Sequence, residues 1–96
     1  MDCEWDEQKK QINLDKHGLS FEDAPLVFAE ACITFEDDRF DYGERRLITL
    51  GRLAGRVVVI VHTPRAEPDR TVTRIISMRK ANERERQIYQ ERLEAH

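Results

Sequence analysis

The chain has few of the residues that build covalent or metal-based frameworks. Its 96 residues include two cysteines, three histidines, four glycines and three prolines. Cys3 and Cys32 are too few for a disulfide framework and lack metal-ligand spacing, so we interpret both as small buried residues of a reducing compartment. His17, His62 and His96 do not share a helix or strand with a second ligand at metal spacing. The sequence therefore predicts neither a disulfide scaffold nor a metal site.

Long apolar runs and the common cofactor motifs are absent too. No segment approaches the roughly 18 consecutive apolar residues of a membrane-spanning helix, and the acidic start Met-Asp-Cys-Glu is not followed by the apolar run of a signal peptide. We therefore expect a cytoplasmic protein with no membrane partner. The chain also lacks a Gly-x-x-x-x-Gly-Lys phosphate loop and a Gly-x-Ser-x-Gly elbow, and we expect no cofactor.

Charge is abundant and unevenly distributed. The net charge is −3, yet residues 1–40 carry eleven acidic and four basic residues, whereas residues 41–96 carry eight acidic and twelve basic ones. A net-acidic protein can therefore have a basic face that binds an anionic partner. The alternative is that a surface with 36% charged residues clusters by chance.

The first third of the chain has the pattern of a short strand and two helices. Residues 2–5 favour a strand, after which Asp6 caps a helix that runs to about His17 and stops at a glycine. Ser20 opens a second helix. Pro25 leaves two starts open for it, because a proline at the fifth helical position removes a backbone hydrogen bond, whereas a regular helix that begins at Pro25 loses none.

The rest of the chain has the period of extended strands, followed by a helix. The unbroken run Val57–Val61 predicts a central strand covered on both faces, and Val72, Ile76 and Met78 are predicted to share one face of the last strand. The pair Asn-x-x-Glu at 82–85 predicts a capping box for the final helix. The predicted strands are 32–36, 44–52, 56–63 and 70–79. We predict an α+β fold: a single small domain over residues 1–96, ordered β-α-α-β-β-β-β-α, with a curled antiparallel sheet covered by helices on one side.

Arginines recur on the predicted strands, and arginine offers a planar fork of donors that fits phosphate. Arg65, Arg74 and Arg79 lie on neighbouring strands, where their side chains either converge on one phosphate or stay scattered and solvated. We predict a phosphate or RNA site here, with Arg45, Arg74 and Lys80 as RNA-binding residues.

Glu44 and His62 are the candidate proton-transfer groups. His62 ends the central strand beside arginines, where an imidazole can move a proton near neutral pH, although a structural histidine fits the same pattern. Glu44 stands beside Arg45, either to accept a hydroxyl proton or in a surface ion pair. RNA hydrolysis needs no metal or nucleotide cofactor, because the substrate's own 2′-hydroxyl is the nucleophile. We therefore hypothesise an endoribonuclease with Glu44, His62, Arg65 and Arg79 as catalytic residues.

Several blocks of residues match a known family in the correct order. They are Glu4 to Glu7, Asn13, Lys16 to Gly18, Ser20 to Ala24, and then residues 38–45, 48–51, 55–56, 63–65 and 74–81. Together these blocks resemble the BrnT toxins of bacterial type II toxin–antitoxin systems, over nearly the whole chain.

The resemblance implies a compact endoribonuclease with a fold similar to the RelE toxins, which inhibits translation by cutting RNA. It also implies neutralisation by a BrnA-type antitoxin with a ribbon-helix-helix DNA-binding part, in a heterotetramer of two toxins and two antitoxins. Promoter DNA would be bound only through that complex. The rival hypothesis is a non-catalytic interaction module whose basic face binds an antitoxin and contributes to DNA-bound autorepression, without a need for Glu44 or His62.

Overall fold

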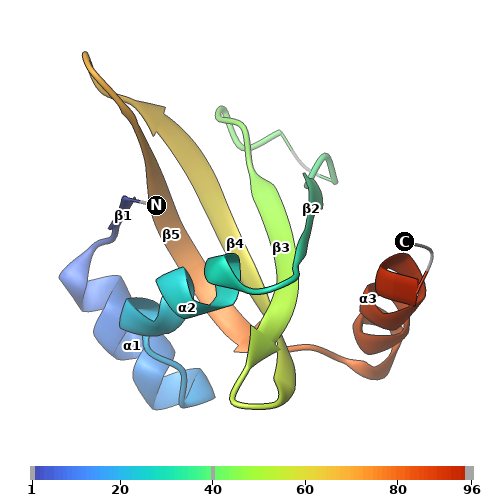
Figure 1. Cartoon of the computed structure of the whole chain (residues 1–96). Coiled ribbons are helices and arrows are strands. Elements are labelled where there is room, and N and C mark those ends of the chain that lie inside the picture. Colours follow the sequence, from blue (N-terminus) through green and yellow to red (C-terminus); the bar gives the residue numbers. More distant parts are fainter. Residues whose placement is uncertain (1, 40, 95–96) are drawn as a thin grey trace.

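The part of the chain that the computed structural model describes, residues 2–39 and 41–94, forms three α-helices, one short 3₁₀ helix and five strands (Figure 1). Phe40, which belongs to a block of the family resemblance, and His96 lie outside the described residues. The elements are β1 (Cys3–Glu4), α1 (Glu7–His17), the 3₁₀ helix η1 (Phe21–Asp23), α2 (Ala24–Ala29), β2 (Ile33–Glu36), β3 (Leu47–Leu53), β4 (Arg56–Ala66), β5 (Thr71–Lys80) and α3 (Glu83–Glu94). The predicted α+β class is confirmed.

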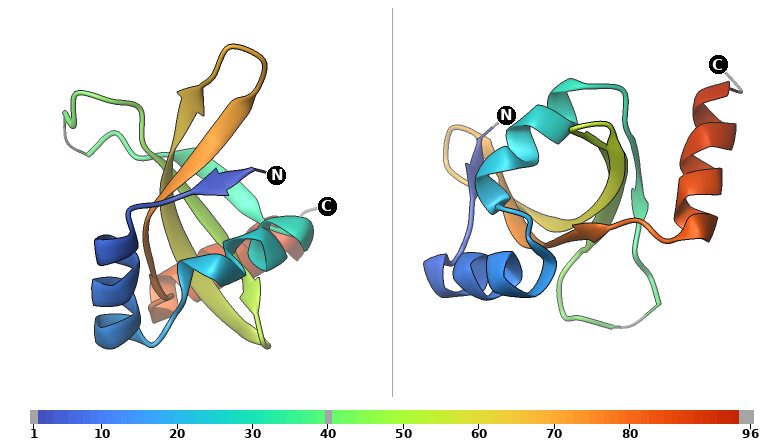
Figure 2. Two further views of the ribbon diagram at one scale, coloured as in Figure 1. Left: turned by 90° about the vertical axis from the view of Figure 1, so that its left-hand side faces the viewer. Right: turned by 90° about the horizontal axis from the view of Figure 1, so that it is seen from below.

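The strands form one curled sheet in the order β1-β5-β4-β3-β2 (Figure 2). Strands β2 to β5 pair antiparallel, as their short connections predict, but β1 lies parallel to β5, with Cys3 beside Thr73 and Glu4 beside Arg74. The prediction of a wholly antiparallel sheet is therefore wrong at this edge, because β1 is connected to the sheet through helices and not through a hairpin.

Helices lie on both faces of the sheet (Figure 2). On one face, Phe21 of η1 and Val27 of α2 join Val58 in one core cluster, and on the other face Tyr89 of α3 joins Val59 in a second cluster. The predicted coverage of the central strand on both faces is confirmed, since Val58 and Val59 are both buried. The prediction that helices cover one side alone is wrong, because α3 packs its apolar side chains behind the sheet.

The ends of the first two helices follow their capping residues. Asp6 accepts backbone hydrogen bonds at the start of α1, and Gly18, with a φ of 70°, ends the helix, as predicted. After Ser20 the chain forms η1, and the regular helix α2 begins at Ala24. Pro25 therefore lies in the first turn of α2, where its missing N–H removes no helical hydrogen bond.

Strand β4 continues beyond its predicted end. Past His62 the strand keeps β5 as a neighbour but no longer β3, whose register ends at the pair Leu47 and His62. Pro64, which has no N–H to donate, is tolerated on such an open edge. The predicted loop 64–69 therefore shortens to a hairpin turn, and Arg65 becomes a strand residue.

Strand β5 contains one extra residue opposite β4. Val61 pairs with Ser77, and His62 pairs with Ile75, so that Ile76 remains between them as a bulge. A bulge of this kind reverses the alternation of side chains along the strand that carries it.

This bulge overturns the predicted face pattern of β5. Val72, Ile76 and Met78 do not share one face, and Ile75, with 1% of its surface exposed, joins Met78 in the core on the α2 side. Arg74, the neighbour of Ile75, therefore projects on the opposite face, where α3 lies.

A buried asparagine joins α1 to the outer edge of β5. The side-chain amide of Asn13 donates to the carbonyl oxygens of Met78 and Leu19, at 2.9 and 3.1 Å, and its Oδ1 accepts from the Met78 N–H at 3.1 Å. Strand β1 covers β5 only near Thr73 and Arg74. Asn13 thus satisfies backbone groups further along the same edge, which would otherwise be buried without partners.

Replacing Asn13 with alanine should lower the free energy of unfolding by about 2 to 4 kcal/mol, because the backbone groups of Met78 lose their partners. Urea unfolding followed by Trp5 fluorescence measures the change. Gln11→Ala is the matched control: its exposed amide bonds to Asp15, and its loss should cost less than about 0.5 kcal/mol. Equal effects of the two substitutions would contradict the role assigned to Asn13.

Candidate functional site

A row of polar residues crosses the α3 side of the sheet, on the strand positions next to the β4–β5 hairpin. Glu4 of β1 lies beside Arg74 of β5, and Arg74 pairs with Thr63 of β4. Arg46 immediately precedes β3, next to this rung, and Arg65 lies two residues beyond Thr63 on the same face of β4. We call Arg46, Arg65 and Arg74 the arginine cluster.

Two arginines of the cluster converge on one carboxylate oxygen. Glu4 Oε2 lies 3.3 Å from Arg65 Nη1 and 3.0 Å from Arg74 Nη1. The parallel register of β1 sets this arrangement, because it places Glu4 directly beside Arg74. Two guanidinium groups aimed at one oxygen form a ready-made position for an anionic group such as phosphate.

The third arginine lies over an aromatic ring. The guanidinium carbon of Arg46 is 4.0 Å from the centre of the Tyr42 ring, and Arg46 Nε lies 3.5 Å from Glu44 Oε1. Nearby, the Thr63 hydroxyl donates to the backbone carbonyl of Arg45, which ties this loop to β4. The loop therefore holds Arg46 and Glu44 beside the sheet.

A buried carboxylate fixes the same loop from within. Asp37 accepts hydrogen bonds from the Arg39 guanidinium at 2.8 and 3.0 Å, and from the Tyr42 hydroxyl at 3.1 Å. The bonds from Arg39 lower the pKa of Asp37 to about 2. Asp37 thereby stays charged at neutral pH and holds Tyr42 under Arg46.

Two buried side-chain atoms of the described residues lack a hydrogen-bond partner, and both belong to this row. They are Glu4 Oε1, an acceptor, and Arg46 Nε, a donor. Buried polar atoms are nearly always satisfied in native proteins, so orphaned ones need a specific explanation. Arg46 Nε has the Glu44 carboxylate at 3.5 Å as an ion-pair neighbour, so the orphaned atom that needs an explanation is Glu4 Oε1.

Glu44 and Arg45, both predicted site residues, have different partners. Glu44 pairs with Arg46, whereas Arg45 Nε lies 2.7 Å from Glu36 Oε1 at the end of β2. The pair of Arg45 and Glu36 is largely exposed to solvent, whereas the Arg46 side chain is only 27% exposed. The structure thus brings Glu44 to the arginine cluster and pairs Arg45 with β2.

Arg79 lies on the same face as the cluster but far along the sheet. Its guanidinium donates to both oxygens of Glu85, at 2.7 and 2.8 Å, and Glu85 also completes the predicted capping box with Asn82. Arg79 pairs with Val59, six residues before Arg65 on β4, which separates the two arginines by about 20 Å along the strand. Arg65 and Arg74 converge as predicted, but Arg79 does not join them.

His62 and Lys80 lie on the other face of the sheet. His62 pairs with Ile75 and Lys80 with Val58, and both of these partners belong to the core cluster on the α2 side. The sheet therefore separates both side chains from the arginine cluster. The predicted placement of His62 beside the arginines is wrong, because the alternation along β4 points it inward.

The surroundings of His62 are those of a structural histidine. Its side chain is buried with 5% exposed, its ring meets the Phe28 ring edge-on at 5.1 Å, and its Nε2 lies 2.7 Å from Thr49 Oγ1. Thr49 Oγ1 lies 2.7 Å from Thr34 Oγ1, so the hydrogen-bond chain crosses three strands. Burial lowers the pKa of His62 to about 4, which leaves the ring neutral at neutral pH.

Glu4 and Arg46 belong to the polar row but are not among the site residues predicted from the sequence. Glu4 enters the row because a two-residue strand pairs parallel to β5, and a signal so short does not define a register. Arg46 lies within the predicted strand 44–52, next to the candidates Glu44 and Arg45. Its contact with the Tyr42 ring depends on the conformation of the loop before β3, which the sequence does not predict. A signal for the row does exist in the sequence, because alternate residues of neighbouring strands lie on one face of a sheet. The bulge at Ile76 reverses this alternation in β5, so the simple pattern selects the wrong residues there.

Within the part of the chain that the structure describes, no group of three or more histidine, cysteine, aspartate or glutamate side chains is arranged to hold a metal ion. The described helices include none that is both long and apolar enough to cross a membrane.

Comparison with known proteins identifies a family. The model of the family described as "Ribonuclease toxin, BrnT, of type II toxin-antitoxin system" matches residues 5–85, which include all three arginines of the cluster. Glu4 immediately precedes the matched span. No curated protein matches the chain.

The buried His62 predicts a specific pH dependence of stability. The pKa of His62 is about 4 in the folded chain, below its ordinary value of 6.5 in the unfolded chain. The neutral ring therefore contributes its full share of the free energy of unfolding above about pH 6.5. This share is lost progressively as the pH falls toward 4, because the unfolded chain takes up the proton first. The difference between the two pKa values corresponds to a loss of up to about 3 kcal/mol in the free energy of unfolding. Urea unfolding between pH 7.5 and 4 should show the loss, and His62→Gln should flatten that part of the profile. His17→Gln, which changes the half-buried histidine at the end of α1, should keep the slope; an unchanged slope in His62→Gln would contradict the assignment.

Proposed function

Because the chain belongs to the BrnT family of ribonuclease toxins of type II toxin–antitoxin systems, we propose that it cleaves RNA at the arginine cluster, by attack of the substrate's own 2′-hydroxyl. The family implies an RNA target and an antitoxin partner. The position of the cleavage site, the role of each residue and the identity of the partner are our proposals.

The observation that carries this proposal is the arrangement around Glu4. Arg65 and Arg74 aim at one oxygen of the carboxylate, while the other oxygen is buried and has no donor. A scissile phosphate bound by the two arginines would lie next to a proton acceptor with an open lone pair. Glu44 and Arg46, on the other side of Thr63, extend the same row.

The proposed reaction divides the work between these groups. Glu4 accepts the proton of the 2′-hydroxyl as its oxygen attacks phosphorus, and Arg65 and Arg74 stabilise the extra negative charge that develops on the phosphoryl oxygens. The bond to the 5′-oxygen then breaks, and this oxygen takes a proton from solvent. The products are a 2′,3′-cyclic phosphate and a free 5′-hydroxyl, and no metal takes part in any step.

The predicted site residues acquire narrower roles in this proposal. Glu44 orients Arg46 and is the second carboxylate of the row, so it is the alternative proton acceptor. His62 has no part in the reaction, since it is buried on the opposite face. Arg79 holds the start of α3 to the sheet through Glu85.

We further propose the partners and context that the family resemblance implies. The antitoxin is of the BrnA type and carries a ribbon-helix-helix part that binds promoter DNA, and two toxins join two antitoxins in a heterotetramer. The free toxin is a single RelE-like domain over residues 1–96 that acts in the cytoplasm and inhibits translation by cutting RNA. The α+β class and the curled sheet support the RelE-like assignment.

Arg65→Ala and Arg74→Ala should each lower the rate of RNA cleavage about 10²-fold or more, because each removes a donor to the transition state. The measurement is cleavage of a defined RNA by the antitoxin-free protein in excess EDTA, with product ends analysed for cyclic phosphate. Arg70→Ala, at an exposed arginine that pairs with Asp2 near the same hairpin, is the control and should cleave normally. Full activity in both cluster variants would refute the proposed site.

Glu4→Gln separates a proton acceptor from a residue that only holds the arginines in place. The substitution removes a negative charge beside Arg65 and Arg74, so RNA affinity should stay the same or increase while kcat falls on the order of 10²-fold. Binding of a 2′-O-methyl RNA and single-turnover cleavage measure the two effects. Asp2→Asn, which neutralises an exposed neighbouring carboxylate, is the control. A kcat that survives in Glu4→Gln would exclude Glu4 and point to Glu44.

A further inference from the structure

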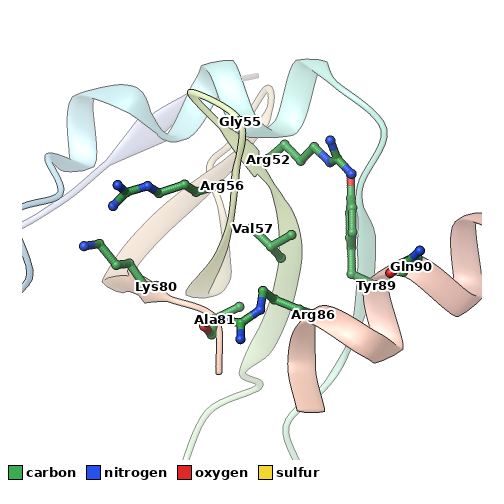
Figure 3. A pocket seen from close by; sticks show the side chains of 9 residues that line it. All are labelled: Arg52, Gly55, Arg56, Val57, Lys80, Ala81, Arg86, Tyr89 and Gln90. Atoms are coloured by element: carbon green, nitrogen blue, oxygen red, sulfur yellow. Dashed lines mark hydrogen bonds between the residues drawn. The ribbon is translucent and has the colours of Figure 1, made fainter. Parts of the chain in front are cut away.

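A basic pocket lies at the opposite end of β4 from the arginine cluster (Figure 3). The turn between β3 and β4, the end of β5 and one side of α3 enclose about 470 Å³. Its lining includes four cationic side chains and no carboxylate: Arg52, Arg56, Lys80 and Arg86. We call this cavity, with its four cationic side chains, the basic pocket.

The positive charge of the basic pocket is not neutralised by the protein. None of the four side chains forms an ion pair with a described residue, and all four are exposed. Arg86 Nη1 donates to the Ala81 carbonyl at 2.9 Å, and the Arg52 guanidinium lies 5.8 Å from the centre of the Tyr89 ring. These contacts orient two of the guanidinium groups and leave most of their N–H donors free.

The arginine cluster differs in this respect. Its three arginines face two carboxylates, Glu4 and Glu44, which leaves a formal charge of +1 there, against +4 in the basic pocket. Affinity for a nucleic acid backbone grows with the number of phosphates that free cations neutralise. The cluster is thus arranged for chemistry at one phosphate, and the basic pocket carries the charge that can hold a strand.

We propose that the basic pocket binds a backbone phosphate of the RNA substrate, outside the position of cleavage. This inference rests on the proposed function for its ligand. Three of the four cations are arginines, whose planar forks match phosphate oxygens. The apolar part of the lining, chiefly Val57, Ala81 and Tyr89, is half-buried or buried and offers little of the exposed aromatic or aliphatic surface that anchors a protein partner.

The positions of the two sites set a minimum length for the RNA. Arg56 begins β4 and Arg65 lies nine residues later, so their backbones are about 30 Å apart. At a stacked spacing of about 3.4 Å per nucleotide, an RNA needs about nine nucleotides to reach from one site to the other. Affinity should therefore rise when the RNA grows past this length, and that rise should depend on the basic pocket.

The experiment measures the affinity of the full chain for uncleavable 2′-O-methyl RNAs of 6 and 20 nucleotides across a range of salt concentrations. The double variant Arg52→Gln and Arg86→Gln, which changes the two cations on the α3 side of the pocket, should lower the slope of log affinity against log salt by about 1.4 for the longer RNA. This change corresponds to a roughly 25-fold loss of affinity at 0.1 M salt, if both proteins bind equally at 1 M. The gain of the longer RNA over the shorter should disappear.

The control is Lys9→Gln with Arg92→Gln, which removes the same charge from exposed positions on α1 and α3 outside the pocket. Its RNA affinity should stay within about twofold of the unmodified chain. Equal losses in both double variants would overturn the inference, because net charge would explain them. So would a pocket variant that binds RNA normally but loses affinity for an acidic antitoxin segment.

The outcome is independent of cleavage. If the chain fails to cut RNA but the pocket variant loses the length-dependent affinity, the basic pocket stands and the proposed reaction fails. If the chain cuts RNA and the pocket variant binds both lengths normally, the reaction stands and the basic pocket fails.

Discussion

The register shift at Ile76 determines which side chains meet on each face of the sheet. With an unbroken alternation, Ile76 would take the place of Ile75 on the α2 side, and Arg74 would turn to that side, away from Glu4. The bulge is thus the arrangement in which Ile75 is buried and Arg74 stands with Arg65 before Glu4. The bulge therefore places Arg74 on the face where Arg65 and Glu4 lie.

Much of the fold follows from local sequence, and much of the site does not. The capping residues Asp6 and Gly18 and the run Val57–Val61 act within one element, so their effects are predictable from neighbours in the chain. The partner of Glu4 is seventy residues away, and it depends on a parallel pairing that no turn encodes. Arg65 and Arg74 are predictable as neighbours because one hairpin joins their strands. The prediction that His62 lies beside the arginines is wrong, because its side chain lies on the opposite face of the sheet.

The two groups of cations illustrate how differently arginines can be used within one small protein. In the arginine cluster each guanidinium is held by a carboxylate or an aromatic ring, which fixes its position at the expense of net charge. In the basic pocket the charges remain free and the geometry is looser. Positioning favours catalysis, since pre-oriented donors need no reorganisation during the reaction, whereas free charge favours capture of a strand. The net charge of −3 gives no indication of either group of cations.

Glu4 occupies the position that a substrate phosphate would take between Arg65 and Arg74, and this competition has a consequence for catalysis. A backbone phosphate carries one negative charge in the ground state, as the Glu4 carboxylate does. Replacing the carboxylate with the phosphate between the two arginines therefore adds little electrostatic binding free energy. In the proposed reaction, the transition state would place additional negative charge on the phosphoryl oxygens, while Glu4 would lose its own charge by accepting the 2′-proton. Both changes strengthen the hold of the arginines on phosphorus at the moment of reaction and not before it. Interactions that become stronger only in the transition state raise kcat, and a carboxylate between two arginines achieves this with residues that the folded sheet already holds in place.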